Sequence, residues 1–285
     1  MALVPERLAT ICGETPERRA WLEQLPDALR ELQGRWSLSL GAPFDGDDVS
    51  CSWVAPVLCA DGTHAVLKLG MPHMEAAHEI EGLRFWDGVP TVRLIEADLD
   101  LNAMLLEQCL PGTALRERPQ QEQDVIVAGL LGRLWRKPAA PHPFRPLSAM
   151  IAHWAGETIA SEHLWPDAGL VREGLRLLEE LSRPSPDDVL LATDLHAGNV
   201  LRAQREPWLV IDPKPFVGDP AYDATQHLLN GMDRMLTAPL ATIQRFADLL
   251  GVDDERVRLW MFARAVAEPR DTWSGDAVTL ASLLA

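Results

Sequence analysis

The feature that most constrains the fold is the segment 187–220, in which short apolar runs alternate with loops that carry acidic side chains. Its first apolar run, Val189–Leu191, predicts a buried strand. Asp194 follows in a loop, and Asn199 comes five residues after Asp194. The segment therefore predicts a polar loop that is held in place by a strand.

Two further apolar runs return a second carboxylate to this loop. Val200–Leu201 predicts a strand, 204–207 a turn, and Trp208–Ile211 another strand, which ends at Asp212. Because a short turn joins the two strands, we expect Asp212 to lie beside Asn199.

Residues of these types at this spacing suit phosphoryl transfer. The D-x-x-x-x-N spacing is that of kinase catalytic loops. Transfer of a γ-phosphoryl group places negative charge on its equatorial oxygens, so Mg²⁺ has to be held by hard oxygen ligands, for which we expect Asn199 and Asp212. Asp194 is expected to accept the hydroxyl proton, while His196 supports the loop backbone. A single loop aspartate is more often a solvated cap, but Gly218–Pro220 extends the pattern into one continuous unit.

This segment resembles the corresponding loop of the aminoglycoside phosphotransferase superfamily, and more narrowly its streptomycin 6-phosphotransferase and hydroxyurea phosphotransferase branch. The run R-E-P-W-L-x-I-D-P at Arg205–Pro213, followed by V-G-D-P at Val217–Pro220, is typical of that branch. The chain departs from the superfamily at Ala192-Thr193, where members commonly have His-Gly or His-Trp before the catalytic aspartate. The resemblance implies ATP- and Mg²⁺-dependent phosphorylation of a hydroxyl on a small molecule.

The resemblance also implies a fold, and 285 residues are enough to bury its core. We expect a protein-kinase-like bilobal α+β fold. A small antiparallel-sheet lobe over residues 1–108 would bind the nucleotide, and a mostly helical lobe over residues 109–285 would carry the catalytic loop and the acceptor site. No apolar run approaches the roughly 20 residues of a membrane span, and the N-terminus lacks the pattern of a signal peptide, so we expect a cytoplasmic protein.

Charge and cysteine content narrow the possible partners. A net charge of −16 argues against nucleic acid or an anionic membrane and is compatible with a cationic partner, although acidity also simply favours solubility. The four cysteines show no paired metal spacing, so we expect reduced thiols and no zinc site. We expect a monomer or a homodimer.

The first third of the chain predicts helices followed by a sheet. Residues 5–33 carry leucines at helical spacing, and Pro26 is expected to open a second helix at its first position. From Trp36 onward, alternating apolar and polar residues around the turn at 60–63 predict a small antiparallel sheet.

Lys68 lies on the third strand of that sheet and is the candidate that grips the α- and β-phosphates. A lone strand lysine is usually a solvated edge charge, but a glutamate-rich helix, expected over residues 71–88, follows at once. Either Glu75 or Glu79 should pair with Lys68. By its position Glu79 resembles the ion-pair glutamate of the family, while Glu75 matches an M-P-x-x-E run of the streptomycin branch, so both remain candidates.

The segment after two further predicted strands, at 92–94 and 103–106, resembles the hinge between kinase lobes. The resemblance implies that adenine binds main-chain atoms here, with Glu107 and Cys109 as the candidates. The loop that covers the phosphates has a weaker signature. Residues 41–50 lack a G-x-G-x-x-G motif, so we expect backbone amides near Ser50 to serve.

The rest of the chain predicts a helical lobe. Asp219 is expected to cap the helix that starts after it, and Asp223 in the first turn of that helix is expected to be structural. The predicted helices are 121–135, 148–164, 168–181, 221–233, 238–250 and 253–268, with Trp260 and Phe262 in the core.

Three alternatives to an aminoglycoside kinase follow from the same residues. Hydroxyurea is the second acceptor that the resemblance names, but the acidic balance favours a cationic aminocyclitol, because carboxylates in a cleft pair with guanidinium or ammonium groups. A kinase-fold binding protein without activity is disfavoured because the base, both metal ligands and the lysine are present. A protein kinase is disfavoured because no long activation segment follows Asp212.

Overall fold

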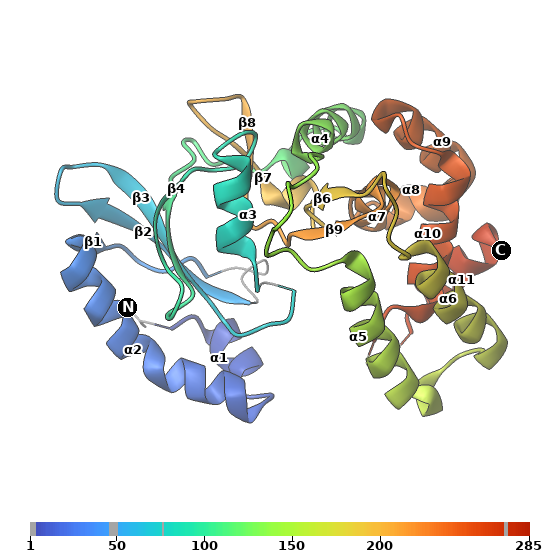
Figure 1. The fold of residues 1–285 in the computed structure, drawn as a ribbon, viewed down its shortest axis with the longest axis horizontal. Coiled ribbons are helices and arrows are strands. Elements are labelled where there is room, and N and C mark those ends of the chain that lie inside the picture. Colours follow the sequence, from blue (N-terminus) through green and yellow to red (C-terminus); the bar gives the residue numbers. More distant parts are fainter. Residues whose placement is uncertain (1–3, 46–50, 76, 271–272) are drawn as a thin grey trace. The chain divides into compact units, whose positions relative to one another are not determined.

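The computed structural model describes residues 4–45, 51–75, 77–270 and 273–285 (Figure 1). These residues form two compact units that are built from different parts of the chain. Unit 1 comprises Met1–Ala114 together with Leu201–Ile211, and unit 2 comprises Leu115–Val200 together with Asp212–Ala285.

Unit 1 is a mixed sheet and helix structure. Its elements are α1 (Glu6–Cys12), α2 (Pro16–Trp36), β1 (Leu38–Leu40), β2 (Ser52–Cys59), β3 (His64–Gly70), α3 (Glu79–Trp86), β4 (Leu94–Asp98), β5 (Ala103–Glu107) and most of the hairpin formed by β7 (Val200–Arg202) and β8 (Trp208–Val210). Strands β1 to β5 form one antiparallel sheet in the order β1-β2-β3-β5-β4, which confirms the predicted small antiparallel sheet.

Successive residues of a strand point to opposite faces of the sheet. Because these strands carry apolar residues on both faces, different helices cover each face. Leu67 and Leu69 of β3 lie in one core with the leucines of α1 and α2. Met104 and Leu106 of β5 lie in a second core with Leu83 of α3. Figure 1 shows α1 and α2 on one side of the sheet and α3 on the other.

The prediction that Pro26 opens the second helix is wrong. Helix α2 begins ten residues earlier, where Pro16 occupies the first turn and Thr15 caps it by accepting a hydrogen bond from the Arg18 amide. Pro26 lies inside the helix. A proline in a helix interior costs about 3 kcal/mol. The leucine face that α2 buries on both sides of Pro26 offsets this cost, since each buried leucine contributes about 1.5–3 kcal/mol.

The prediction of a helix over residues 71–88 is also wrong at its start. The Met71 amide donates to the Cys51 carbonyl (3.0 Å), which extends the strand pairing past β3. Pro72 then disfavours the helical conformation for the residue before it. Helix α3 therefore begins only at Glu79, and it ends at Asp87 in a left-handed conformation.

Most of the β7–β8 hairpin belongs to unit 1, although it follows the segment that carries Asp194 and Asn199 in sequence. The Val92 amide donates to the Val210 carbonyl and the Val210 amide donates to the Pro90 carbonyl, both at 3.0 Å. These bonds hold Val92 beside β8, so the strand predicted at 92–94 joins the five-stranded sheet only from Leu94.

Unit 2 is mostly helical, as predicted. Its elements are α4 (Gln120–Leu134), α5 (Leu147–Ala160), α6 (Ala168–Leu181), β6 (Val189–Leu191), β9 (Phe216–Gly218), α7 (Pro220–Leu229), α8 (Met232–Thr237), α9 (Pro239–Leu250), α10 (Asp254–Ala267) and α11 (Gly275–Leu284), with short 3-10 turns at Leu115–Glu117, Glu162–Leu164 and Ala197–Asn199. The core lies along α10, where Trp260 and Phe262 are buried as predicted.

Two helices of unit 2 differ from the predictions. The helix expected at 221–233 is divided into α7 and α8 around Asn230 and Gly231. Asp219 caps α7 as predicted, since its carboxylate accepts a hydrogen bond from the Ala221 amide (3.0 Å). The last helix, α11, was not predicted; its Ser274 cap accepts from the Ala277 amide.

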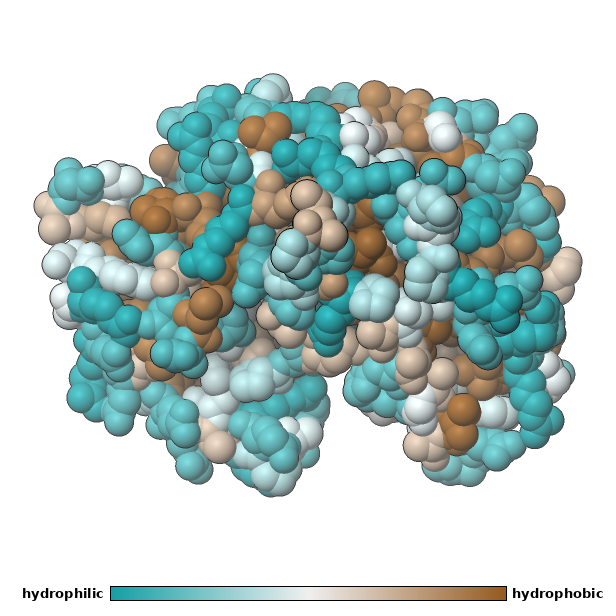
Figure 2. All heavy atoms as spheres, viewed as in Figure 1, coloured by the Kyte–Doolittle hydropathy of each residue, from teal (hydrophilic) through white to brown (hydrophobic). Residues whose placement is uncertain are grey.

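Among the helices formed by the described residues, none is long and apolar enough to span a membrane. On the face drawn in Figure 2, hydrophilic and hydrophobic residues are interspersed.

Candidate active site

The loop that carries Asp194 is fixed by side chains and by backbone pairing within unit 2. Strands β6 and β9 pair antiparallel on one side of the loop, with Leu191 opposite Phe216. The main-chain amides of Ala192 and Thr193 donate to the Asp223 carboxylate at 3.0 and 2.8 Å. These bonds position the peptide units just before Asp194.

Asp223 lies in the first turn of α7 and is buried, in keeping with the structural role expected for it. It also accepts a hydrogen bond from the Trp135 indole (3.0 Å). Burial raises the pKa of Asp223 to about 6, although the three hydrogen-bond donors act in the opposite direction. The sequence indicated this structural role of Asp223, because the residue lies in the first turn of a predicted helix that Asp219 caps.

The departure from the superfamily pattern at Ala192-Thr193 has a local explanation. Thr193 has a φ of 45°, and its hydroxyl donates to the Lys214 carbonyl at 2.7 Å. The Lys214 amide in turn donates to the Ala192 carbonyl at 2.8 Å. The threonine therefore links the loop to the segment after Asp212.

Asn199 closes the loop from its other end. Its Nδ2 donates to the Asp194 main-chain carbonyl at 3.0 Å, which orients the amide so that Oδ1 is directed away from that bond. His196 supports the turn, since its Nδ1 accepts from the Gly198 amide at 3.0 Å. The histidine thus braces the backbone, as predicted.

Asp212 follows β8 after one intervening residue, Ile211, and Asn199 directly precedes β7. Because β7 and β8 are hydrogen-bonded neighbours joined by a short turn, the two residues lie at the same end of the hairpin. Asp212 has a φ of 53°, and its Oδ1 accepts from the Lys214 ammonium. Lys214 is buried with 7% exposure, so a positive charge is already held next to this carboxylate.

The Asp194 carboxylate has a partner that the sequence did not indicate. Nε2 of Gln226 donates to Oδ1 of Asp194 at 2.8 Å. Gln226 lies one helical turn after Asp223 on α7. Residues three apart share a helix face, so the loop-binding role of Asp223 was the signal that could have pointed to Gln226.

In unit 1, Lys68 pairs with Glu79. Both carboxylate oxygens of Glu79 lie 2.6 Å from the Lys68 Nζ. Lys68 is 6% exposed and Glu79 2% exposed, so the pair is buried. Glu79 is the first residue of α3, where the helix dipole favours a negative charge. Of the two glutamates that sequence reasoning left open, the structure joins Glu79 to the lysine.

Arg205 holds the segment that was predicted to be the hinge, a role that its place in the R-E-P-W-L motif did not indicate. Its guanidinium binds the Glu107 carboxylate through Nε (3.0 Å) and Nη2 (2.8 Å), and it also donates to the carbonyls of Gly88 and Thr91. Burial would raise the pKa of Glu107, but hydrogen bonds from Arg205 and from the Arg93 amide lower it below its ordinary value. The Glu107 side chain is therefore committed to a structural ion pair.

Cys109 is buried beyond the end of β5. Burial raises the pKa of its thiol to about 12, with the Glu107 carboxylate acting in the same direction. The thiol is therefore protonated and unreactive at neutral pH. Among the described residues no cysteine forms a disulfide.

The expected phosphate-covering amides near Ser50 lie outside the described residues. The preceding residues run beside β2, because the Gly41 amide donates to Pro56 and the Phe44 amide donates to Val54. Of the predicted site residues, Lys68 and Glu79 form an ion pair within unit 1, and Asn199 donates a hydrogen bond to the Asp194 carbonyl within unit 2.

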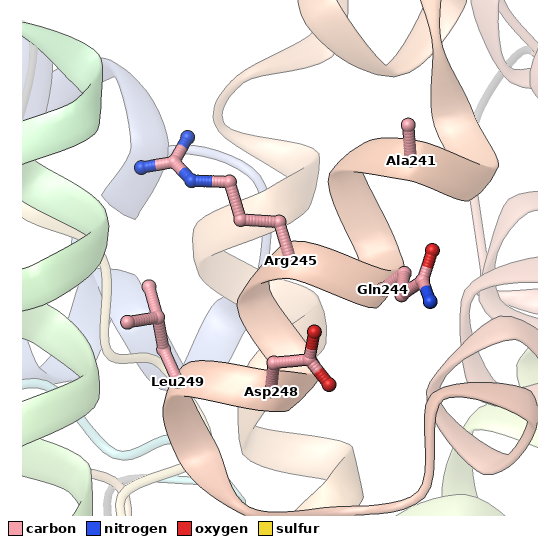
Figure 3. A pocket seen from close by; sticks show the side chains of 5 residues that line it. All are labelled: Ala241, Gln244, Arg245, Asp248 and Leu249. Atoms are coloured by element: carbon pink, nitrogen blue, oxygen red, sulfur yellow. The ribbon is translucent and has the colours of Figure 1, made fainter.

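A surface hollow of about 500 Å³ lies along α9 in unit 2 (Figure 3). Arg245 and Leu249 extend to one side of the helix and Gln244 and Asp248 to the other, with Ala241 one turn away. One helix supplies all of these side chains, and none is a predicted site residue. The hollow is therefore separate from the catalytic loop.

Comparison with known proteins identifies the family. The chain matches the family described as aminoglycoside/hydroxyurea antibiotic resistance kinase over residues 35–273. It is 39% identical to the hydroxyurea phosphotransferase of Kitasatospora aureofaciens over 255 residues, which cover 87% of this chain and 73% of that protein. It is 36% identical to the streptomycin 6-kinase of Streptomyces glaucescens over 274 residues, which cover 92% and 88% of the two chains.

Solved structures support the same fold. The choline kinase LicA of Streptococcus pneumoniae matches with a TM-score of 0.61 at 12% identity, covering 92% of this chain and 97% of that chain. A macrolide 2'-phosphotransferase type I matches with a TM-score of 0.55 at 16% identity, covering 91% and 96%. These likenesses confirm the predicted kinase-like α+β fold. The chain is therefore a small-molecule phosphotransferase that belongs to the aminoglycoside/hydroxyurea antibiotic resistance kinase family.

Proposed function

We propose that the protein transfers the γ-phosphoryl group of ATP to a hydroxyl of a streptomycin-like aminoglycoside in the cytoplasm. The observation that carries this proposal is the geometry of the catalytic loop. The Asp223 carboxylate fixes the backbone before Asp194, and the Asn199 amide ties the loop back to Asp194 at 3.0 Å. A loop held this rigidly suits a base that must meet its proton in one geometry.

The residues proposed to bind ATP lie in unit 1, and the nucleotide lobe is proposed to span residues 1–108. The buried Lys68–Glu79 pair supports this role. Burying two charges costs free energy that their attraction often does not recover, so such a pair is better explained by a function than by a gain in stability. Lys68 would grip the α- and β-phosphates. At the proposed hinge, the Glu107 amide already donates a hydrogen bond to the Arg93 carbonyl. Adenine is therefore proposed to hydrogen-bond with the Glu107 carbonyl and the Cys109 amide. The LicA relative has been solved with AMP.

The residues proposed to hold Mg²⁺ are Asn199 and Asp212, and their chemistry fits that ion. An amide oxygen and a carboxylate are hard ligands, and Mg²⁺ takes few protein ligands when phosphates and waters supply the rest. The Lys214 ammonium already places a positive charge against the Asp212 carboxylate, which supports the proposal that this carboxylate can bind a cation. Mg²⁺, when bound, would neutralise charge on the phosphate oxygens.

In the proposed reaction the acceptor hydroxyl gives its proton to the Asp194 carboxylate while its oxygen attacks the γ-phosphorus. The bond between that phosphorus and the β,γ-bridging oxygen breaks, and ADP leaves. The helical lobe, proposed to span residues 109–285, would hold the acceptor against Asp194.

The two curated relatives motivate two candidate acceptors. The match to the streptomycin kinase covers more of both chains, and the net charge of −16 favours a cationic acceptor. The identity of 39% to the hydroxyurea phosphotransferase keeps hydroxyurea as the second candidate.

The test is ADP release by the purified protein with MgATP and a panel of hydroxyl compounds that includes streptomycin and hydroxyurea. The proposal expects acceptor-dependent release with streptomycin that is lost in Asp194→Asn. Release with hydroxyurea alone would favour the second candidate. Nucleotide binding without acceptor-dependent release for any compound would favour an inactive kinase-fold binding protein.

A further inference from the structure

A chain of polar side chains connects the centre of unit 2 to the proposed base. Gln226 of α7 lies between two groups of opposite charge. Its Nε2 donates to Oδ1 of Asp194 at 2.8 Å, and its Oε1 accepts from Nη2 of Arg264 at 2.8 Å. Gln226 is therefore a bridge between a buried cation on α10 and the carboxylate on the catalytic loop.

Arg264 is held by several contacts at once. It is 3% exposed, and its Nη1 donates to the Thr225 hydroxyl at 2.6 Å. Its Nε donates to Glu268 at 3.1 Å, and its guanidinium lies 5.2 Å from the Tyr222 ring centre. Burial acts to lower the pKa of Arg264, but Glu268, Tyr222 and Asp194 raise it above its ordinary value. Arg264 is thus a fixed and permanently charged donor.

This fixed donor decides which way the Gln226 amide points. A guanidinium can only donate hydrogen bonds, so the glutamine atom that faces Arg264 must be the oxygen. The other end of the amide, which faces Asp194, is then the N–H donor. Without Arg264 the amide could turn over and present its oxygen to the carboxylate.

We infer that Gln226, oriented by Arg264, is a positioning residue that holds the Asp194 carboxylate in the rotamer from which it meets the acceptor hydroxyl. The inference rests on the proposed role of Asp194 as base. The oriented hydrogen bond on Oδ1 restrains the plane of the Asp194 carboxylate, and misplacing a reacting group by about 1 Å costs up to about 100-fold in rate.

The competing interpretation is that Gln226 only stabilises the helical core, and Gln226→Glu separates the two. A glutamate keeps the shape and still accepts from Arg264, so a structural role would survive the change. As a carboxylate it has no hydrogen to donate to Asp194 and adds a like charge beside it, and as a protonated acid it shares its proton with Asp194, so either form disturbs the proposed base. We therefore expect Gln226→Glu to lower kcat by at least about tenfold while the KM for MgATP changes by less than about twofold.

Two variants complete the kinetic test. Gln244→Glu makes the same chemical change at an exposed position on α9 and should leave kcat within about twofold of the parent, in line with the small effects of surface substitutions. Gln226→Met removes both hydrogen bonds and should lower kcat as Gln226→Glu does. A Gln226→Glu variant with parental kcat would overturn the inference.

A spectroscopic measurement tests the contact without any acceptor. The side-chain ¹⁵N–¹H resonances of Gln226 are identified by their absence in Gln226→Glu. A hydrogen bond to a carboxylate shifts the amide proton downfield, so Asp194→Asn should move this resonance upfield and leave that of Gln244 unchanged. An unmoved Gln226 resonance would overturn the inference. A moved resonance in a protein that phosphorylates no acceptor would support the contact and count against the proposed function instead.

Discussion

At the scale of single residues, the loop that carries Asp194 combines one local contact with contacts to residues far away in the sequence. Asp194 and Asn199 are five positions apart, so one strand and one turn place them together. The partner of Asp194 comes from 32 positions away, and Arg205 reaches Glu107 across 98 positions. No spacing in the sequence encodes such pairs, because tertiary packing creates them.

The metal assignment is testable at this scale. Asn199→Ala and Asp212→Ala each remove one oxygen ligand from an ion that prefers octahedral geometry, so both should weaken MgATP binding by roughly tenfold or more while leaving metal-free ATP binding less affected. Calorimetry of ATP binding with and without Mg²⁺ measures the difference. Parental MgATP affinity in both variants would remove these residues from the metal site.

At the scale of elements, the apolar patterns predicted the presence of helices and strands more accurately than they predicted the first residue of each one. The α6 helix and the β6 strand have the predicted bounds because their apolar residues start and stop with the element. The α3 helix starts eight residues late because Met71 continues a strand pairing that the helical pattern of Glu75 and Glu79 did not reveal. The leucine face of α2 overrode the signal of Pro26.

The hydrogen bonds between Asp223 of α7 and the loop that carries Asp194 should contribute to stability. Asp223→Ala leaves the Ala192 and Thr193 amides without their buried acceptor, so the free energy of unfolding should fall by about 3–5 kcal/mol and turnover should drop with it. Asp276→Ala is the matched control, because Asp276 also lies in the first turn of a helix but is exposed. Urea unfolding of the parent and both variants provides the measurement. Equal losses in the two variants would contradict the anchoring role.

The ion pair between Glu107, at the end of β5, and Arg205 should make stability depend on pH. The folded-state pKa of Glu107 is lowered, so its ion pair with Arg205 stabilises the fold above the ordinary value of 4.5 and loses this effect as pH falls through the lowered pKa. Glu107→Gln should therefore lower Tm at pH 7, and the difference from the parent should shrink as pH falls below 4.5. Glu122→Gln, which removes an exposed pair with Arg118, should have a much smaller effect. A Glu107→Gln difference that is independent of pH would contradict the assignment.

At the scale of the whole molecule, the sequence predicted the kinase-like α+β fold and the family. The acceptor could not be predicted in the same way. Its contacts are expected to come from side chains of the helical lobe, and these follow no fixed spacing. Of the features of the sequence itself, the net charge of −16 bears on the choice, because it favours a cationic acceptor.

This preference predicts a dependence on salt. The KM for a cationic aminocyclitol should rise as the Debye length falls from about 10 Å at 0.1 M to about 3 Å at 1 M salt, because the attraction to exposed carboxylates is screened. Neutral hydroxyurea should show almost no change at saturating MgATP. An aminocyclitol KM that is constant across this range would show that the net charge does not contribute to acceptor choice.

The measurement that tests the central claim most directly is detection of the phosphorylated acceptor by mass spectrometry after incubation with MgATP. The proposed mechanism predicts that the parent converts streptomycin to a product with one added phosphoryl group. Asp194→Asn should bind MgATP with near-parental affinity and form this product about 10²–10⁴-fold more slowly. Near-normal product formation by Asp194→Asn would contradict the claim that Asp194 is the base.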